Sequence, residues 1–354
     1  MGLLRRRAES AENTRVVAPR RFGKTSLLRR VAAEMEADGW ATVYVDFFGV
    51  LTTADIAERI ERAYVEQLTG RLATWFAGVR RLLVPTVRAG GGPVPVSAEV
   101  SLDARAEPPL LERLALPRRL YERDGTRTLV VFDEFQDVLA AGDRTDAVVR
   151  SEIQHHSDAA SYVFAGSAVG MMRELFADQR RAFYGQAGPL DLGPLAPDDV
   201  APYVDERFAR TGRSVAPEAL GALLDATAGH PQRTMLLAHV MWEATPPGGR
   251  ADGQTWLAAW DRVLEVEVRD ELRAVWSGLS GGQRQMLATI ADDTRPLYSR
   301  AAQRETGGSR GGAPRAAVKA LLDRGEVVED ARATTGHRVV DPLLRAWVRA
   351  GRRE

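Results

Sequence analysis

The feature that most constrains the fold is a strand–loop–helix pattern in residues 15–30, RVVAPRRFGKTSLLRR. A short β-branched run, Val16 and Val17, precedes a loop that ends in Gly-Lys-Thr. Apolar residues then recur with the 3.6-residue period of an α-helix. The spacing matches the phosphate-binding loop G-x-x-x-x-G-K-[ST], with Ala18 in the place of the first glycine. This pattern predicts the first βα unit of a P-loop α/β fold.

The chemistry of such a loop is phosphate binding. Backbone N–H groups at the helix N-terminus can surround a β-phosphate, and Gly23 permits close backbone approach. Lys24 would reach the β- and γ-phosphate oxygens, and the Thr25 hydroxyl would bind Mg²⁺. The candidate nucleotide-binding residues are Ala18, Pro19, Arg20, Arg21, Phe22, Gly23, Lys24, Thr25 and Ser26. The alternative is a helix start that binds no ligand.

A second element fits the first. The stretch TLVVFDEFQDV contains an apolar strand, residues 129–132, that ends in Asp133 and Glu134. In a P-loop protein the first acid completes the Mg²⁺ shell and the second orients and deprotonates the attacking water. Together, the two elements predict nucleotide binding and hydrolysis.

Two further stretches predict parallel strands. ATVYVDFF (41–48) follows the first helix, as a βαβ unit requires, and SYVFAGSAVGMM (161–172) follows the acidic strand. Ser167 lies just past the end of this last strand, either as a polar sensor of the γ-phosphate or as the cap of the following helix. His155 and His156 are expected on a solvated helix surface, and no metal site is assigned to them.

The composition restricts the cellular setting. Lys plus Arg and Asp plus Glu each number 48, so no net charge draws the chain to nucleic acid or membranes. The chain has no cysteine, and no apolar run approaches the roughly 18 residues of a membrane helix. We expect a cytoplasmic protein. Only Lys24 and Lys319 are lysines, which suggests that Lys24 is kept for its compact ammonium group.

The stretch LSGGQRQMLATIAD (279–292) begins with the signature of ABC-type ATPases. In those proteins the signature precedes the acidic strand, whereas here Glu134 lies far upstream. Ser280 is a good helix N-cap, and Met286, Leu287 and Ile290 would share one face of the helix that follows. The sequence therefore favours an ordinary amphipathic helix over an ABC site.

This helix, residues 281–292, begins a pattern typical of a winged helix. LYSRAAQRETG follows, then a helix in APRAAVKALLDRG, and then EVVED and HRVVD as a hairpin wing. Residues 276–354 carry 14 basic and 9 acidic side chains. Two interpretations remain open: duplex DNA binding, or packing on the ATPase or on a partner protein. The candidate DNA-binding residues are Arg310, Arg315, Lys319, Arg332 and Arg338.

An insertion, residues 70–127, separates the second strand from the acidic strand. RAGGGPVPVSAEVSLDAR predicts a β-hairpin, and PPLLERLALPRRLYERDG predicts an amphipathic helix after Pro108 and Pro109. The hairpin is either a partner or DNA contact, or an inert elaboration of the sheet edge.

Six motifs taken together resemble the archaeal-type ATPase family, a prokaryotic group near the STAND and origin-initiator branches of the AAA-like NTPases. In order, they are VVAPRRFGKTSLL, VVFDEFQ, YVFAGSAVGMM, FYGQAGPLDLGPL, TAGHPQRTMLLA and HRVVDPLLRAWVR, and the match spans about residues 10 to 350. The family often has alanine at the position of Ala18. This resemblance implies a helical lid in which Gly229 and Pro231 pack on adenine and ribose and Arg233 senses phosphate. Without the other motifs, GHPQR would be interpreted as a helix–helix turn.

Two departures from the family pattern bear on turnover. Only about 15 residues precede the first strand, which leaves the completeness of the adenine pocket open. Relatives commonly have arginine where this chain has Gln186, so a trans-acting arginine would have to be Arg180 or Arg181.

The sequence thus predicts an α/β P-loop NTPase with a three-layer parallel sheet (1–195, including the insertion), a helical lid (196–275) and a C-terminal winged helix (276–354). The expected ligands are ATP or ADP and Mg²⁺, in a switch whose lid and winged helix move with nucleotide state. The alternatives are an ATP-dependent DNA-binding protein of the initiator or transposition-helper type, and a hydrolysis-poor scaffold in signalling or defence. A protein partner or homo-oligomer is also expected, and no membrane.

Overall fold

The computed structural model describes residues 2–70, 73–74, 107–297 and 312–351. The chain divides into two compact units. The first comprises Met1–Ala18 and Lys24–Asp191, and the second comprises Pro19–Gly23 and Leu192–Glu354.

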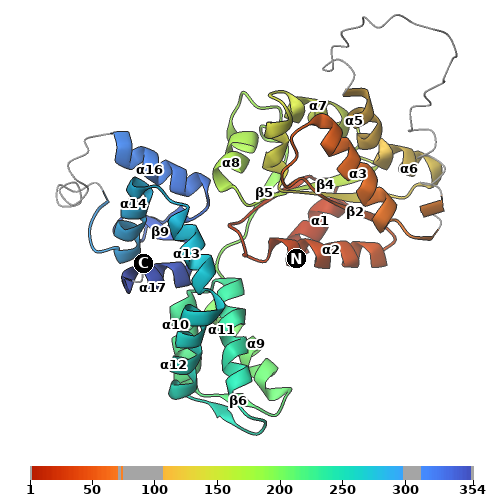
Figure 1. The fold of residues 1–354 in the computed structure, drawn as a ribbon. Coiled ribbons are helices and arrows are strands. Elements are labelled where there is room, and N and C mark those ends of the chain that lie inside the picture. The colour runs from red at the N-terminus through yellow and green to blue at the C-terminus, as the bar shows by residue number, and fades with distance from the viewer. Residues whose placement is uncertain (1, 71–72, 75–106, 298–311, 352–354) are drawn as a thin grey trace, which may run out of the picture. The chain divides into compact units, whose positions relative to one another are not determined.

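A five-stranded, fully parallel sheet forms the centre of the first unit (Figure 1). Its order is β2-β3-β4-β1-β5. The strands are β1 (Thr14–Val17), β2 (Ala41–Asp46), β3 (Thr128–Asp133), β4 (Ala160–Gly166) and β5 (Gly188–Asp191). Every residue of β3 and β4 is buried, which explains why both read as continuous apolar runs. The predicted α/β fold with a parallel sheet is therefore confirmed.

Helices cover both faces of this sheet. They are α1 (Gly2–Glu9), α2 (Lys24–Ala37), α3 (Thr53–Gln67), α5 (Glu107–Leu114), α6 (Leu116–Asp124), the 3₁₀-helix η2 (Phe135–Ala141), α7 (Thr145–Ile153) and α8 (Val169–Ala177). Figure 1 shows α1 and α2 on one face and α3, α5 and α7 on the other. Val130 and Phe132 of β3 join a core with α3, α5, α7 and α8, while the alternate residues of this strand face the opposite layer.

The insertion differs in part from the prediction. The expected hairpin lies outside the described residues. The single helix expected after Pro109 is instead two helices, α5 and α6. Pro117 lies in the first turn of α6, where its missing N–H costs nothing, and Gly125 ends α6 with a left-handed φ of 75°.

The second unit is mainly helical. Its helices are α9 (Pro197–Ala209), α10 (Pro217–Thr227), α11 (Pro231–Ala244), α12 (Gly253–Arg262), the π-helix η3 (Val263–Glu267), α13 (Arg269–Ser277), α14 (Gly281–Asp292), α16 (Gly312–Asp323) and α17 (Pro342–Arg349). Two short pairs of strands accompany them, β6 (Ser214–Val215) with β7 (Arg250–Ala251) and β8 (Val327–Glu329) with β9 (His337–Val339). One hydrophobic core runs from α9 to α17, so the segments expected to be lid and winged helix share it.

The C-terminal part has the expected winged-helix elements. α14 and α16 precede the antiparallel β8–β9 hairpin, which forms the wing. Most of the stretch LYSRAAQRETG, from residue 298 onward, lies outside the described residues. α14 begins with a reciprocal capping box, in which the Ser280 hydroxyl accepts from the Gln283 N–H and the Gln283 side chain accepts from the Ser280 N–H. The interpretation of LSGGQ as a helix start is confirmed.

Gly229 occupies a position where any side chain would be strained. Its φ is +73°, and an added Cβ would lie 2.3 Å from the Leu195 carbonyl oxygen. We expect Gly229→Ala to destabilise the second unit by about 2–4 kcal/mol, because left-handed strain and a backbone clash combine. Urea unfolding followed by tryptophan fluorescence measures this. Gly221→Ala within α10, where an added Cβ meets nothing within 4 Å, is the matched control and should be neutral or stabilising. Equal stability of the two variants would contradict the conclusion that position 229 requires glycine.

Candidate nucleotide site

The candidate residues meet at one edge of the sheet because parallel strands end there together. Val17 of β1 pairs with Gly166 of β4, and Asp133 at the end of β3 pairs with Asp46 of β2. The loop after β1, the Asp-Glu pair after β3 and Ser167 after β4 therefore lie at the same carboxyl edge. Sequence motifs far apart in the chain are brought together by topology alone.

Lys24 lies among the acids of the β3 end. Its Nζ is 3.2 Å from Asp133 Oδ1 and 3.2 Å from Glu134 Oε1. The ammonium is almost fully buried, with 8% of the side chain exposed. The two carboxylates compensate the charge of the buried ammonium, and its flexible stem allows it to move to another anion.

Glu134 is held in an unusual backbone conformation by its neighbours. Its φ is +48°, in the left-handed region that is uncommon for non-glycine residues. One carboxylate oxygen, Oε2, accepts hydrogen bonds from the Ser167 N–H (3.0 Å), the Ser167 hydroxyl (2.9 Å) and the Gln136 amide (2.7 Å). Burial by itself would raise the pKa of Glu134, but the Gln136 hydrogen bond, the Lys24 charge and the Ser167 donors outweigh it and hold the pKa below its usual value.

Asp133, one of the two predicted metal ligands, is bound by a side chain that sequence reasoning missed. The hydroxyl of Tyr44 on β2 donates a hydrogen bond to Asp133 Oδ2. Burial and the Asp133 carboxylate raise the pKa of Tyr44, so the hydroxyl stays protonated. Gln136 was missed as well. The one available signal for Tyr44 was a polar-tipped ring in an otherwise buried strand.

Two residues of the loop after β1 have a positive φ. Gly23 has a φ of +80°, and an added Cβ there would meet nothing within 4 Å. Arg21 also has a positive φ, of 67°, whereas Ala18 does not. Because Ala18 is buried with an ordinary negative φ, a methyl group replaces the first glycine of the motif without strain. The exposure of the remaining loop residues is mixed: Phe22 is buried, Pro19 is half-buried, and Arg20, Thr25 and Ser26 are exposed.

Arg180 and Arg181, the candidates for a trans-acting arginine, pair with acids close to them in sequence. Arg180 binds Asp178 and is 89% exposed. Arg181 binds Glu174 and lies 4.0 Å from Asp146. Gln186, which stands where relatives have arginine, accepts a hydrogen bond from Arg150.

Arg233, the predicted phosphate sensor, is fully buried within the second unit. Its Nε lies 3.1 and 3.0 Å from the two Asp341 carboxylate oxygens, and one terminal nitrogen lies 2.6 Å from Glu271. Burial opposes the charged form, but Asp341 and Glu271 outweigh it and raise the pKa of Arg233. Asp341 also caps α17 by accepting from Leu343, so Arg233 joins α11 to α13 and α17. Pro231, at the start of α11, is half-buried. A phosphate role for Arg233 would require exchange of these carboxylates.

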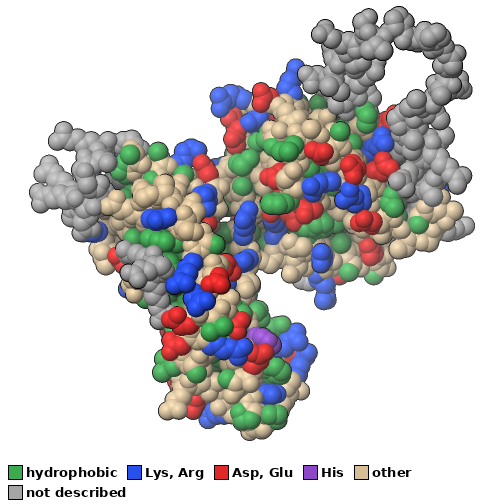
Figure 2. Space-filling view, viewed as in Figure 1, with side chains coloured by type: hydrophobic (Ala, Val, Ile, Leu, Met, Phe, Trp, Pro, Cys, Tyr) green, Lys and Arg blue, Asp and Glu red, His purple; other side chains and the backbone are tan. Residues whose placement is uncertain are grey.

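The candidate DNA-binding residues are partly engaged by acids. Lys319 is 2.8 Å from Asp323 on α16, and Arg338 is 3.3 Å from Asp330 on the wing. Arg315 and Arg332 are exposed, and Arg310 lies outside the described residues. On the face of the first unit in view, Figure 2 shows acidic and basic side chains interspersed.

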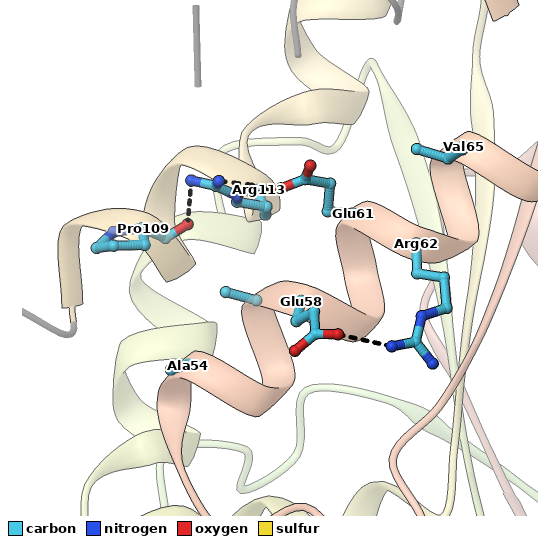
Figure 3. Close-up of a pocket in the computed structure, with 8 residues that line it drawn as sticks. Ala54, Glu58, Glu61, Arg62, Val65, Pro109 and Arg113 are labelled. Atoms are coloured by element: carbon cyan, nitrogen blue, oxygen red, sulfur yellow. Dashed lines mark hydrogen bonds and ion pairs between the residues drawn. The ribbon is translucent and has the colours of Figure 1, made fainter. Parts of the chain in front are cut away.

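A hollow between α3 and α5 lies away from the motif residues (Figure 3). Its charges neutralise one another: Arg62 is 2.6 Å from Glu58, and Arg113 is 3.0 Å from Glu61. This self-paired lining does not suggest an ionic ligand.

The expectation that both histidines lie on a solvated surface is wrong for His156. It is 1% exposed, and its Nδ1 lies 2.7 Å from the Tyr162 hydroxyl. Burial lowers the pKa of His156, so it acts as a neutral core residue. Its tertiary partner on β4 could not be seen from the local sequence.

Solved structures share this fold. The Walker-type ATPase Paby2304 of Pyrococcus abyssi superposes with a TM-score of 0.65 at 18% identity, over 95% of this chain and 90% of that one. The Aeropyrum pernix ORC2 protein in its ADPNP–ADP complexes superposes with a TM-score of 0.59 at 18% identity, over 100% and 94%. The fold is that of a Walker-type ATPase. The predicted resemblance to archaeal P-loop ATPases is thus confirmed at the level of the fold. No protein-family model and no curated protein matches the sequence.

The described residues contain neither a membrane-spanning helix nor a self-sufficient metal site. No helix among them is long and apolar enough to cross a membrane. No group of three or more His, Cys, Asp or Glu side chains among them could hold a metal ion by itself.

Proposed function

We propose that this protein binds Mg²⁺-ATP at the loop of residues 18–26 and hydrolyses it. The observation that carries the proposal is the placement of Lys24 between Asp133 and Glu134, 3.2 Å from each, at the first turn of the helix that follows the loop. A buried ammonium that is held only by exchangeable ion pairs can transfer to phosphate oxygens when a nucleotide enters. The test is binding of a fluorescent ATP analogue together with phosphate release, in wild type and in the two variants treated in the Discussion.

The chain's own groups account for the chemistry. Loop amides and Lys24 stabilise negative charge on the β- and γ-phosphates. The Glu134 carboxylate, ionised because its pKa is held down, accepts the proton of the attacking water. Ser167 fixes the orientation of this carboxylate through two hydrogen bonds, which supports its predicted place beside the γ-phosphate.

A magnesium ion fits the donors present. Asp133 and Thr25 supply the hard oxygen ligands that Mg²⁺ prefers, and Tyr44 holds Asp133 by a hydrogen bond. A bound Mg²⁺ would neutralise phosphate charge. We infer that Tyr44 positions the Asp133 ligand.

Adenine is favoured over guanine. The sequence has no Asn/Thr-Lys-x-Asp guanine motif after the sheet, and the structurally similar ORC2 protein is in complex with ADPNP and ADP. We further propose that nucleotide state changes the position of the lid and winged helix, as in a switch. The hydrolysis-poor scaffold remains the rival, and it differs in showing negligible phosphate release.

A second candidate function is duplex DNA binding by the winged helix. The excess of basic residues in 276–354 and the exposed Arg315 and Arg332 favour it, whereas the acid-paired Lys319 and Arg338 weaken it. If it holds, Arg315→Glu combined with Lys319→Glu should weaken salt-dependent binding of a fluorescent duplex at least about tenfold. Arg250→Glu, an exposed arginine on β7, is the control. Binding that is absent in wild type, or unaffected by the double reversal, would reject this candidate.

A further inference from the structure

The helical part of the second unit has an apolar groove that the proposed nucleotide chemistry does not use. It lies between α9 and α11, has a volume of about 450 Å³, and is also lined by residues of the turn after α9. Its lining comprises Tyr203, Val204, Arg207, Phe208, Arg210, Thr211, Met235, Ala238, His239 and Trp242. This volume is within the range of known ligand pockets, about 300–1,000 Å³.

The floor and walls are apolar and already positioned. Val204, Phe208 and Ala238 are buried and form the floor, while Tyr203 is 41% exposed at the rim. The Trp242 indole N–H donates to the Thr211 hydroxyl at 2.8 Å, which fixes the ring. Pre-formed aromatic and aliphatic walls favour a bulky apolar side chain, since little entropy is lost on binding.

The charges that line the groove are of one sign. The charged residues of the lining are Arg207 and Arg210, and the lining contains no acid. Arg210 is paired with Glu206, and His239 lies 3.3 Å from Glu243. In the described part of the chain Arg207 has no carboxylate partner; its guanidinium lies 4.9 Å from the centre of the Tyr203 ring instead. The rim therefore presents an unneutralised cation beside an apolar cavity.

We propose that this groove docks an acidic segment of a partner protein, with a bulky apolar residue in the cavity and a flanking carboxylate on Arg207. Charge complementarity selects an acidic occupant, and the concave apolar floor selects a peptide anchor. A nucleic acid strand fits less well, because bases need free ring faces for stacking. Here the Arg207 guanidinium already contacts the Tyr203 ring. The Trp242 ring is contacted by the Arg213 guanidinium, 4.5 Å from the ring centre, and by the stacked His239 ring. The proposal does not depend on the proposed ATPase activity.

The test uses the full chain and a phage-displayed library of random dodecapeptides. We expect enrichment of peptides that carry Asp or Glu next to Trp, Phe or Leu. One enriched peptide, synthesised with a fluorophore, is then titrated by anisotropy. Tyr203→Ala and Arg207→Glu should each weaken binding about tenfold or more, as expected for a hot-spot ring and a charge reversal.

Both positions are exposed, so the variants should melt like wild type. Leu257→Ala and Arg250→Glu, exposed residues of the same unit outside the groove, should leave peptide affinity unchanged. The proposal is overturned by enrichment of basic peptides, or by equal affinity in the Arg207→Glu variant. It is also overturned if fluorescent oligothymidine binds and is lost on Tyr203→Ala, or if the groove instead mediates dimers that Tyr203→Ala dissociates.

Discussion

Lys24→Ala is expected to weaken binding of a fluorescent ATP analogue at least about 100-fold, which corresponds to roughly 3 kcal/mol. The ammonium is the one buried cation that Asp133 and Glu134 contact among the described residues. Its removal leaves the phosphates without their direct charge partner. It also leaves the Asp133 and Glu134 carboxylates without their cation, so the negative charge facing the phosphates increases.

The chain supplies a matched control, because its only other lysine is Lys319. The Lys319 side chain is 77% exposed and paired with Asp323 on the same helix, so Lys319→Ala should leave nucleotide affinity unchanged. Equilibrium titration and a thermal melt of each variant complete the comparison. A folded Lys24→Ala protein that keeps wild-type affinity would show that the loop is not the nucleotide site.

Glu134→Gln is expected to keep nucleotide binding within about twofold but to lower kcat for phosphate release by about 10²–10⁴. The amide has the size of the carboxylate and still offers an oxygen to Ser167 or Gln136. It cannot take a proton from water at neutral pH. Loss of the Glu134 carboxylate therefore slows the chemical step more than it weakens nucleotide binding.

The control for this substitution is Glu66→Gln, an exposed acid of α3, which should turn over like wild type. Single-turnover phosphate release separates chemistry from product release. If wild type releases negligible phosphate, and Glu134→Gln changes nothing while nucleotide stays bound, the hydrolysis-poor scaffold replaces the ATPase.

The proximity of Lys24, Asp133, Glu134 and Ser167 could be predicted from the sequence, whereas their roles stay a prediction. Asp133 ends β3, the other three residues follow strands of the same sheet, and parallel strands end at a common edge. The helix start at Ser280 was predicted correctly for a similar reason, since a capping box is contained within four residues.

Other parts of the site depend on partners that local patterns do not encode. Tyr44 reaches Asp133 across 89 residues of sequence, and Arg233 reaches Asp341 across 108. His156 turns inward because of one hydroxyl on β4. Pro117 was a signal for the break between α5 and α6, but the helical spacing of apolar residues continues across this proline and predicted a single helix.

The continuous core from α9 to α17 has a consequence for how the movement of one helix is transmitted through the second unit. Trp276 of α13 packs edge-on against Trp347 of α17 at 6.1 Å, and the Arg233–Asp341 pair joins α11 to α17. Because interiors this closely packed resist deformation, a tilt imposed on α11 carries the C-terminal hairpin with it. The wing is therefore expected to move together with α11 and not as an independent domain.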